Sequence, residues 1–483
     1  MSTSTVRTYG GWRERRGFGV AGMDGRGTAI SVATGVLVLL VGMFTSIGLL
    51  VVAPLLLVVL AATVLRWRGE PLVLLARRHI AFRRAHRRGW TRHRAGVGRP
   101  EEAEWTLPGP LAATVLVDAL DDHARPWSVV WDRRSGRLTS TLRVAPTSTW
   151  LVGPEQVDEW VGSWHAWLAK LGYSPMVRHV AVTVETTPAP SSALAAAVRP
   201  RLVADPPKAS LGLVEELLAN SPTTAASVAT RVAVTVDPAQ STTPLPTLPE
   251  QVAEFSRVLD GLARALTGCG VVVLGRATVA DMVATVRGAY DPASRDALSV
   301  SRARLTWADA RPQAAQEHWD HFQSDSGTSV SWGWDEAPRQ AVPATVLANL
   351  IAPGPHAKRV TIIFTPSPAA AAARELDLQA QAAVFRSQLR AKTGRDESAR
   401  DAADRARAMQ AAAEEARGAG LVSMCLYATV TVTDPSALSR AVADTEARAE
   451  EARIRLRRLY AGQAVGFAAG LSVGVNPADL QGR

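Results

Sequence analysis

The chain has 483 residues, of which 47% are hydrophobic, so it has room for two or three folded domains and is not a disordered scaffold. Its formal net charge of +10 is unevenly spread, because residues 1–99 hold 16 arginines and 3 acidic residues whereas residues 100–483 hold 38 basic and 41 acidic residues. The acidic-leaning body argues against direct nucleic-acid binding there, since phosphate neutralisation needs clustered Lys and Arg.

An uncharged apolar stretch runs from Gly27 to Leu65. One straight helix over this stretch would be about twice as long as a bilayer core is thick, about 30 Å. Two short passes fit better, because residues 44–48 are polar enough to turn and both flanks are rich in arginine. The sequence predicts a transmembrane hairpin in the inner (cytoplasmic) membrane, multi-pass with both termini in the cytoplasm. One tilted pass from about Val36 to Leu65 is the alternative.

A basic amphipathic helix is expected next, from about Arg66 to Arg94. Paired arginines alternate there with apolar residues, a pattern typical of helices that lie along anionic lipid head groups. His79, His86 and His93 recur every seven residues, but metal ligands on a helix sit three or four apart, which favours a solvated face. The predicted lipid-facing residues are Arg77, Arg78, Arg83, Arg84, Arg87 and Arg88.

The body that follows alternates strands and helices. Residues 126–146 have the pattern of a hairpin, and a helix from Pro154 to Gly172 carries a tryptophan stripe whose spacing favours packing under a sheet over ligand binding. Two segments echo each other: "RVAVTVDPA" (231–239) and "YATVTVTDPSA" (427–437) each read as a strand that stops at Asp-Pro and leads into a helix. This echo predicts two α+β units related by a pseudo-repeat.

The predicted fold class is therefore α+β, with an N-terminal transmembrane helical hairpin followed by two ferredoxin-like α+β units. The expected divisions are a cytosolic N-terminal segment (1–26), the hairpin (27–65), a basic juxtamembrane helix and linker (66–104), a first α+β domain (105–290), a connector (291–327) and a second α+β domain with a long helix over about 369–417 (328–483).

The motifs of common catalytic and metal sites are missing from the sequence. It contains no Gly-x-x-x-x-Gly-Lys-Ser/Thr phosphate loop, no Cys-x-x-Cys pair and no His-Glu-x-x-His. No Gly-x-Ser-x-Gly elbow is expected to stand before a helix, so no nucleophilic serine is nominated. "QEHWDHFQSD" (316–325) is the richest acid–imidazole cluster, open to a metal or an acid–base pair, but a polar surface helix is the favoured interpretation. Cys269 and Cys425 are expected to be buried free thiols. We predict no enzyme activity, no catalytic, cofactor-binding or metal site, and no cofactor.

The last sixty residues, which include "SMCLYATVTVTDPSALSRAVADTEARAEEARIRLRRLYAGQAVGFAAGLSVGVNP", resemble the end of the N-terminal domain of conjugation and type IV secretion ATPases. In that family a strand and a long helix lead to a Gln, an aromatic residue and a small or Leu-Pro-x-Gly step before the motor domain. The matching residues here are Gln463, Phe467, Leu471 and Gly474. Ser472 stands where the family has Pro, and the chain stops where the family continues into its motor.

Nearly the whole chain also resembles an actinobacterial membrane-protein family associated with such ATPases. The likeness is carried by "YGGWRERRGFG", by the hairpin, by "LTWADARPQAAQEHWDHFQSDSGTSVSWGWDEAPRQAV" and by "KRVTIIFTPSPAAAAARELD". The resemblance implies a membrane-anchored, non-catalytic scaffold that recruits a separate ATPase in trans. A structural inner-membrane subunit of a type VII-like secretion system is the alternative. The expected partners are membrane lipids, the ATPase and further copies of the chain, with no direct nucleic-acid binding by the soluble body.

Overall fold

The computed structural model describes residues 7–10, 66–67, 70–95, 107–149, 152–188, 198–203, 206–219, 226–300, 305–336, 338, 340–392, 399–416 and 420–480. Contacts within the chain divide it into two compact units. The sheet unit comprises Met1–Gly10, Thr91–Pro366 and Val422–Arg483, and the helical unit comprises Gly11–Trp90 and Ser367–Leu421.

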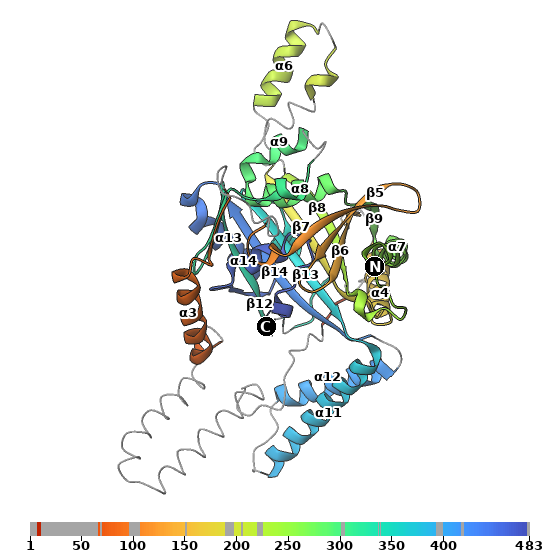
Figure 1. Ribbon diagram of the computed structural model, residues 1–483. Coiled ribbons are helices and arrows are strands. Elements are labelled where there is room, and N and C mark those ends of the chain that lie inside the picture. Colours follow the sequence, from red (N-terminus) through yellow and green to blue (C-terminus); the bar gives the residue numbers. More distant parts are fainter. Residues whose placement is uncertain are drawn as a thin grey trace, which may run out of the picture. The chain divides into compact units, whose positions relative to one another are not determined.

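The sheet unit is built on one antiparallel sheet of 13 strands (Figure 1). The strands follow one another in the order β3-β10-β11-β12-β14-β13-β7-β8-β6-β5-β4, with β15 added to β12 and β9 added to β6. Their bounds are β3 Arg92–Arg94, β4 Thr114–Leu120, β5 Pro126–Asp132, β6 Arg137–Pro146, β7 Val177–Pro188, β8 Ala226–Val236, β9 Val271–Arg276, β10 Ala314–Glu317, β11 Phe322–Ser324, β12 Gly327–Glu336, β13 Ala357–Pro366, β14 Val422–Val432 and β15 Arg455–Arg458.

Two parts of this sheet share one chain order and one pairing pattern. In the first part β6, α4 (Pro154–Leu171), β7, β8, α7 (Leu248–Leu266) and β9 follow in sequence, and β6 pairs with β8 and β9 while β7 pairs with β8. In the second part β12, α10 (Ala348–Ile351), β13, β14, α13 (Leu438–Glu451) and β15 repeat the arrangement. The parts meet where β7 pairs with β13, in register from Thr186↔Lys358 to Val180↔Phe364.

This pairing corrects the expected fold class, which was a transmembrane hairpin followed by two ferredoxin-like α+β units. The described strands form one continuous sheet of 13 strands and not the sheets of two separate units. The physical reason is that β7 and β13 would each be an unpaired edge in an isolated unit, and they satisfy their backbone groups by pairing with each other. Sequence patterns of alternation do not reveal which edge strands meet.

The predicted transmembrane hairpin, residues 27–65, lies outside the described residues. Among the residues that the structure does describe, no helix is both long enough and apolar enough to cross a membrane. This finding stands against the expected multi-pass location with both termini in the cytoplasm, and that location is not carried forward.

Helices α4 and α7 cover one face of the first part of the sheet, and α10 and α13 cover the same face of the second part. Val232 and Val234 of β8 pack with Phe255 and Leu259 of α7, and Trp167 of α4 joins this core. Trp164 stacks on Trp167, with ring centroids 5.0 Å apart. The expected packing of the tryptophan stripe under a sheet is therefore confirmed.

The local echo of strand, Asp-Pro and helix is also confirmed. After β8, the Asp237 side chain accepts a hydrogen bond from the Ala239 amide, and after β14 the Asp434 side chain accepts one from the Ser436 amide. Each aspartate thus caps a short 3₁₀ turn in which proline takes the first position, where no backbone N–H is needed.

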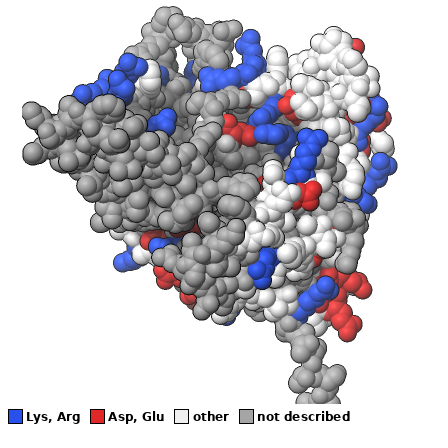
Figure 2. Space-filling view, turned by 90° about the horizontal axis from the view of Figure 1, so that it is seen from below, with Lys and Arg blue, Asp and Glu red and all other residues white. Residues whose placement is uncertain are grey.

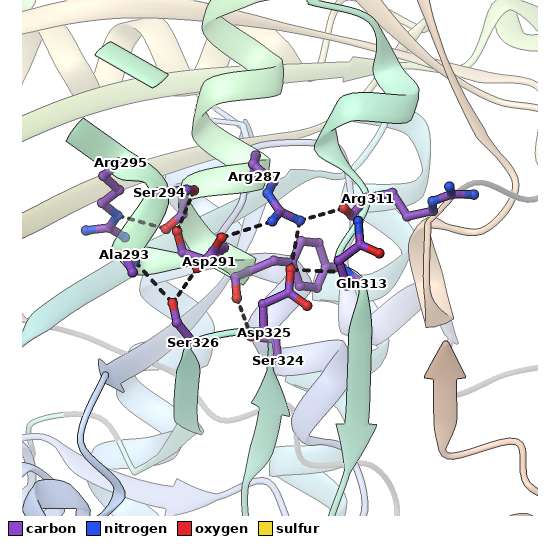
Figure 3. A network of polar contacts seen from close by, with 12 residues as sticks. Arg287, Asp291, Ala293, Ser294, Arg295, Arg311, Gln313, Ser324, Asp325 and Ser326 are labelled. Atoms are coloured by element: carbon purple, nitrogen blue, oxygen red, sulfur yellow. Dashed lines mark hydrogen bonds and ion pairs between the residues drawn. The ribbon is translucent and has the colours of Figure 1, made fainter. Parts of the chain in front are cut away.

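Residues 291–327 add a β-hairpin to the sheet. Helix α8 (Val279–Tyr290) ends there and α9 (Arg295–Val300) follows, before β10 and β11 pair with each other. Arg287 of α8 fixes the hairpin: its guanidinium contacts Asp291 at 2.9 Å, Asp325 at 2.7 Å and the Arg311 carbonyl at 2.6 Å (Figure 3). The expected surface helix over 316–325 is wrong, because these residues form the two strands and their turn.

The remaining helices belong to insertions and to the helical unit. In the sheet unit, α6 (Lys208–Ala219) lies between β7 and β8. The helical unit holds β1 (Arg66–Trp67), β2 (Glu70–Pro71), α3 (Leu72–Arg87), α11 (Ala369–Lys392) and α12 (Ala399–Ala416), the last two inserted between β13 and β14. The long helix expected over about 369–417 is thus described as two helices. Neither cysteine forms a disulfide, as predicted, but each is half-buried.

Replacing a side chain beside the β7–β13 pairing tests how much stability depends on it. Ile363 of β13 is 1% exposed. We expect Ile363→Ala to lower the free energy of unfolding by about 2–5 kcal/mol, because it leaves a cavity in a packed core. Leu274→Ala, at a β9 position that is 60% exposed, is the matched control and should change stability by no more than about 0.5 kcal/mol. Denaturant unfolding followed by circular dichroism measures both, and equal effects would contradict this account of the core.

Candidate functional site

The residues that carry the family resemblance lie in one stretch, Gly462–Leu480, here called the C-terminal segment. It contains α14 (Gln463–Ala469) and α15 (Pro477–Leu480). The segment lies on the sheet face opposite α7, since Ala233 of β8 clusters with Ala469 while its neighbours Val232 and Val234 pack with α7. From one end to the other it contacts β12, β13, β8 and β6, at Ser331, Arg359, Thr235 and Thr139.

Gln463 is fully buried and binds strand β12 through its side-chain amide. Its Oε1 accepts a hydrogen bond from the Ser331 amide at 2.7 Å, and its Nε2 donates to the carbonyls of Ser331 at 3.3 Å and Leu459 at 2.9 Å. The side-chain amide of Gln463 therefore satisfies the N–H group of Ser331 and shares its carbonyl with the Leu459 amide, which donates to it at 3.0 Å.

Phe467 joins an aromatic cluster to a buried charge. Its ring centroid lies 5.0 Å from that of Tyr290 and 4.9 Å from that of Phe322. The guanidinium carbon of Arg359 stands 4.5 Å from the same centroid, which is a cation–π arrangement. Phe467 thus connects the end of α8 and the β10–β11 hairpin with the centre of the sheet.

Leu471 and Gly474 complete the contact. Leu471 is fully buried in the cluster that also contains Phe467. Gly474 has a φ of +84°, and a Cβ there would stand 2.1 Å from Oγ1 of Thr139, so only glycine fits. Ser472 has a φ of +59°, which a proline ring cannot adopt, so proline would not fit at this position.

The sheet face under the segment is lined with hydroxyl groups that pair across neighbouring strands. Each pair has an oxygen–oxygen distance of 2.9 Å. Thr141 in addition donates to the Ser472 carbonyl at 2.8 Å. The hydroxyls therefore satisfy one another within the sheet, largely without help from the segment; the pairs are Thr139–Thr235, Thr183–Thr361, Ser329–Thr431 and Ser331–Thr429.

A charged cluster lies on the same face, around Glu185 of β7. Its carboxylate contacts Arg231 at 2.8 Å and Arg295 at 3.1 Å. Burial raises the pKa of Glu185, but Arg231, Arg295 and Arg359 together bring that pKa well below its ordinary value. Burial lowers the pKa of the Arg359 guanidinium to about 10. Within the described part of the chain, neither Nη atom of Arg359 has a hydrogen-bond partner.

His179 of β7 is a second buried ionisable group under the segment. Burial lowers its pKa to about 4; Arg137 and Arg178 also lower it, whereas Asp479 of α15 and the Gly474 backbone raise it. Asp479 itself binds Arg137 at 2.5 Å and Arg178 at 3.1 Å, which fixes α15 to β6 and β7. His179 is therefore held neutral at ordinary pH.

The acid–imidazole cluster of residues 316–325 lies at the β10–β11 turn. The rings of His318 and His321 stack with centroids 4.2 Å apart, and His321 Nδ1 lies 2.8 Å from Asp320. Glu317 accepts a hydrogen bond from the Ala464 amide at 3.0 Å, and burial raises its pKa. No set of three or more His, Cys, Asp or Glu among the described residues is placed to hold a metal ion. The cluster anchors the start of α14.

The predicted basic helix is present in the helical unit as α3, and it is shorter than expected. Five of the six predicted lipid-facing arginines are exposed; Arg78 is half-buried, and burial lowers its pKa. Leu74 and Ile80 are exposed beside them. A groove of about 820 Å³ along the helix is lined by Leu72, Ala76, Arg77, Ile80, Ala81, Arg84, Arg88 and Trp90. His93 lies on β3 and not on α3, so the three histidines do not share a helix.

No family model matches this sequence, and comparison with curated proteins gives no significant match. The resemblance to secretion ATPases therefore rests on the residues of this chain. The structure brings Gln463, Phe467, Leu471 and Gly474 together in one segment and places the α3 arginines on one helix. Sequence reasoning missed Glu185, Arg231, Arg359 and His179. The pattern that could have revealed them is a charged or imidazole side chain within a predicted strand whose other residues are mostly apolar.

Truncating Gln463 tests whether its amide holds the segment. Gln463→Ala leaves the buried N–H group of Ser331 without its partner, which costs about 1–3 kcal/mol, whereas the Ser331 carbonyl keeps its hydrogen bond from the Leu459 amide. We expect Gln463→Ala to lower the free energy of unfolding by about 1–3 kcal/mol. Gln156→Ala, on the exposed face of α4, is the control. Thermal and denaturant unfolding decide, and a Gln463→Ala protein as stable as the control would refute this role.

Proposed function

We propose that this chain is a non-catalytic scaffold subunit of a conjugation or type IV secretion-like apparatus and that it recruits a separate ATPase. The observation that carries the proposal is the position of Gln463, Phe467, Leu471 and Gly474. All four fix the C-terminal segment on the sheet, so they are packing positions and do not face a substrate. A resemblance carried by such residues favours a shared supporting domain over a shared reaction.

The docking surface for the ATPase is proposed on α11 and α12. These helices pack against each other, and each leaves a large apolar side chain exposed: Leu378 is 53% and Met409 51% exposed. The sheet edges are further candidate contacts, and β9 exposes Val272 and Leu274. Several copies of the chain are proposed to assemble around one ATPase, since such motors act as rings in the resembling family.

Co-purification tests the proposal directly. The tagged full-length chain is co-expressed with a conjugation-type ATPase taken from the genome that encodes the chain. The chain should hydrolyse no ATP alone and should capture the ATPase. The double change Leu378→Glu and Met409→Glu should reduce capture at least tenfold, because it places charge in the proposed contact.

The matched control is Leu213→Glu with Leu217→Glu, which changes two residues of α6 that are each 62% exposed. It should leave capture unchanged. ATP hydrolysis by the isolated chain, or failure of the wild-type chain to bind the ATPase, would contradict the scaffold proposal.

Anionic lipid is proposed as a second partner, bound along α3. The groove combines the apolar side chains of Leu72, Ile80 and Trp90 with Arg77, Arg84 and Arg88, an arrangement that suits acyl chains and phosphate groups. Arg88 also lies over the Trp90 ring, 4.9 Å from its centroid. Figure 2 shows basic and acidic side chains of described residues side by side in the middle of that face, whereas the described lining of the α3 groove holds basic residues and no acidic one.

Charge removal on α3 tests lipid binding. Changing Arg77, Arg84 and Arg88 to Gln should weaken binding to vesicles containing phosphatidylserine about a hundredfold, since each arginine near an anionic surface contributes about 1 kcal/mol. The control changes Arg133, Arg134 and Arg257 of the sheet unit to Gln, which removes the same charge. Vesicle sedimentation measures both. Equal binding of the wild-type chain to neutral and anionic vesicles, or tighter binding to DNA, would overturn the proposal.

A further inference from the structure

Buried polar atoms without hydrogen-bond partners gather under the C-terminal segment. Within the described residues, these are Nη1 and Nη2 of Arg359 and Oγ of Ser472, and the His179 ring is fully buried beside them. Buried polar groups are normally paired, so such a concentration at one contact needs an explanation. Each of these atoms would find water as soon as the segment moved away from the sheet.

The sheet face beneath the segment is suited to solvent. Its hydroxyls are already paired with one another across the strands, as at Thr139–Thr235 and Ser331–Thr429, and these bonds persist without the segment. Arg231 and Arg295 reach solvent at the border of the same face and keep Glu185 ionised. The opposite face, under α4 and α7, is apolar, so its side chains depend on those helices to keep them away from water.

The segment is buried along most of its length, and polar contacts hold its two ends. The Gln463 amide binds one end, the apolar side chains of Phe467 and Leu471 bind the middle, and Asp479 binds the other end through Arg137 and Arg178. Its backbone takes left-handed conformations at Ser472 and Gly474. Such conformations are favourable for a non-glycine residue such as Ser472 only while surrounding contacts impose them.

We propose that the C-terminal segment is a releasable cover of the polar sheet face, and that acid promotes its release. Release exposes the hydroxyl and arginine side chains of β6, β7, β8 and β13 and hydrates the His179 ring and the three unpartnered atoms of Arg359 and Ser472. The sheet itself stays intact, because its strand pairs do not involve the segment. This inference is independent of the recruitment of an ATPase.

The groups that face His179 set the sign of the pH dependence. They are Asp479 of α15, Arg137 of β6, Arg178 of β7 and the backbone at Gly474. Covered His179 has a pKa of about 4, whereas an exposed histidine has a pKa of about 6.5. The uncovered state therefore binds the proton more tightly. The covered state is fully favoured above about pH 6.5 and weakens by about tenfold for each unit of pH between about 6.5 and 4.

Hydrogen–deuterium exchange of the full-length chain tests the proposal. Exchange in peptides covering 463–480, corrected for the intrinsic effect of pH, should be about tenfold faster at pH 5.5 than at pH 7.5. Peptides from β13 and β14 should show no such change. His179→Leu should abolish the acid effect because it removes the titrating group. His123→Gln, at an exposed turn, is the control and should retain it.

A second variant keeps the test decisive if His179→Leu folds poorly. Gly474→Ala places a Cβ against Thr139 and should increase exchange of 463–480 at both pH values while β13 and β14 remain protected. Wild-type exchange that is equal at both pH values would overturn the proposal. So would an acid effect that persists in His179→Leu, or a Gly474→Ala chain in which segment and sheet lose protection together.

Discussion

The backbone pairing of β7 with β13 is the interaction on which the rest of the sheet unit depends. It joins two parts that have the same chain order, and it does so in register over seven residue pairs, from Thr186↔Lys358 to Val180↔Phe364. Without it each part would present an unpaired strand edge to solvent, which is a hazard for aggregation. With it, the chain gains one sheet wide enough for helices on one face and a long crossing segment on the other.

The C-terminal segment depends on that width. Its contacts run from Ser331 on β12 to Thr139 on β6, so it binds strands from both parts of the sheet at once. Neither part alone offers the full set of partners, because Gln463 needs β12 whereas Asp479 needs Arg137 and Arg178. The segment can therefore make all its contacts only when the sheet is complete. These contacts join residues far apart in the sequence, and such contacts tend to form late in folding.

The sequence predicted local features well and assembly poorly. The helix from Pro154, the packing of its tryptophans against the sheet and the two Asp-Pro caps depend on spacing within one segment, and the structure confirms them. The β7–β13 pairing and the β10–β11 hairpin depend on partners far away in the chain, which alternation cannot identify. At the candidate site, Gln463 and Gly474 were found by resemblance, but Glu185, Arg359 and His179 were missed because only the folded sheet brings their partners together.

The buried polar face explains why those missed residues are charged. A sheet face that is always covered is stabilised most by apolar side chains, because burying apolar surface is favourable. The side of β8 that carries Val232 and Val234 is of this kind. The other side of the same strands carries Thr235 and Arg231, and its neighbours carry His179, Glu185 and Arg359. Burying such groups costs free energy that apolar residues would not cost, and a partnerless guanidinium costs most. That composition is reasonable for a face which spends part of its time in water, and the apolar contacts of Phe467 and Leu471 then set how often the segment covers it.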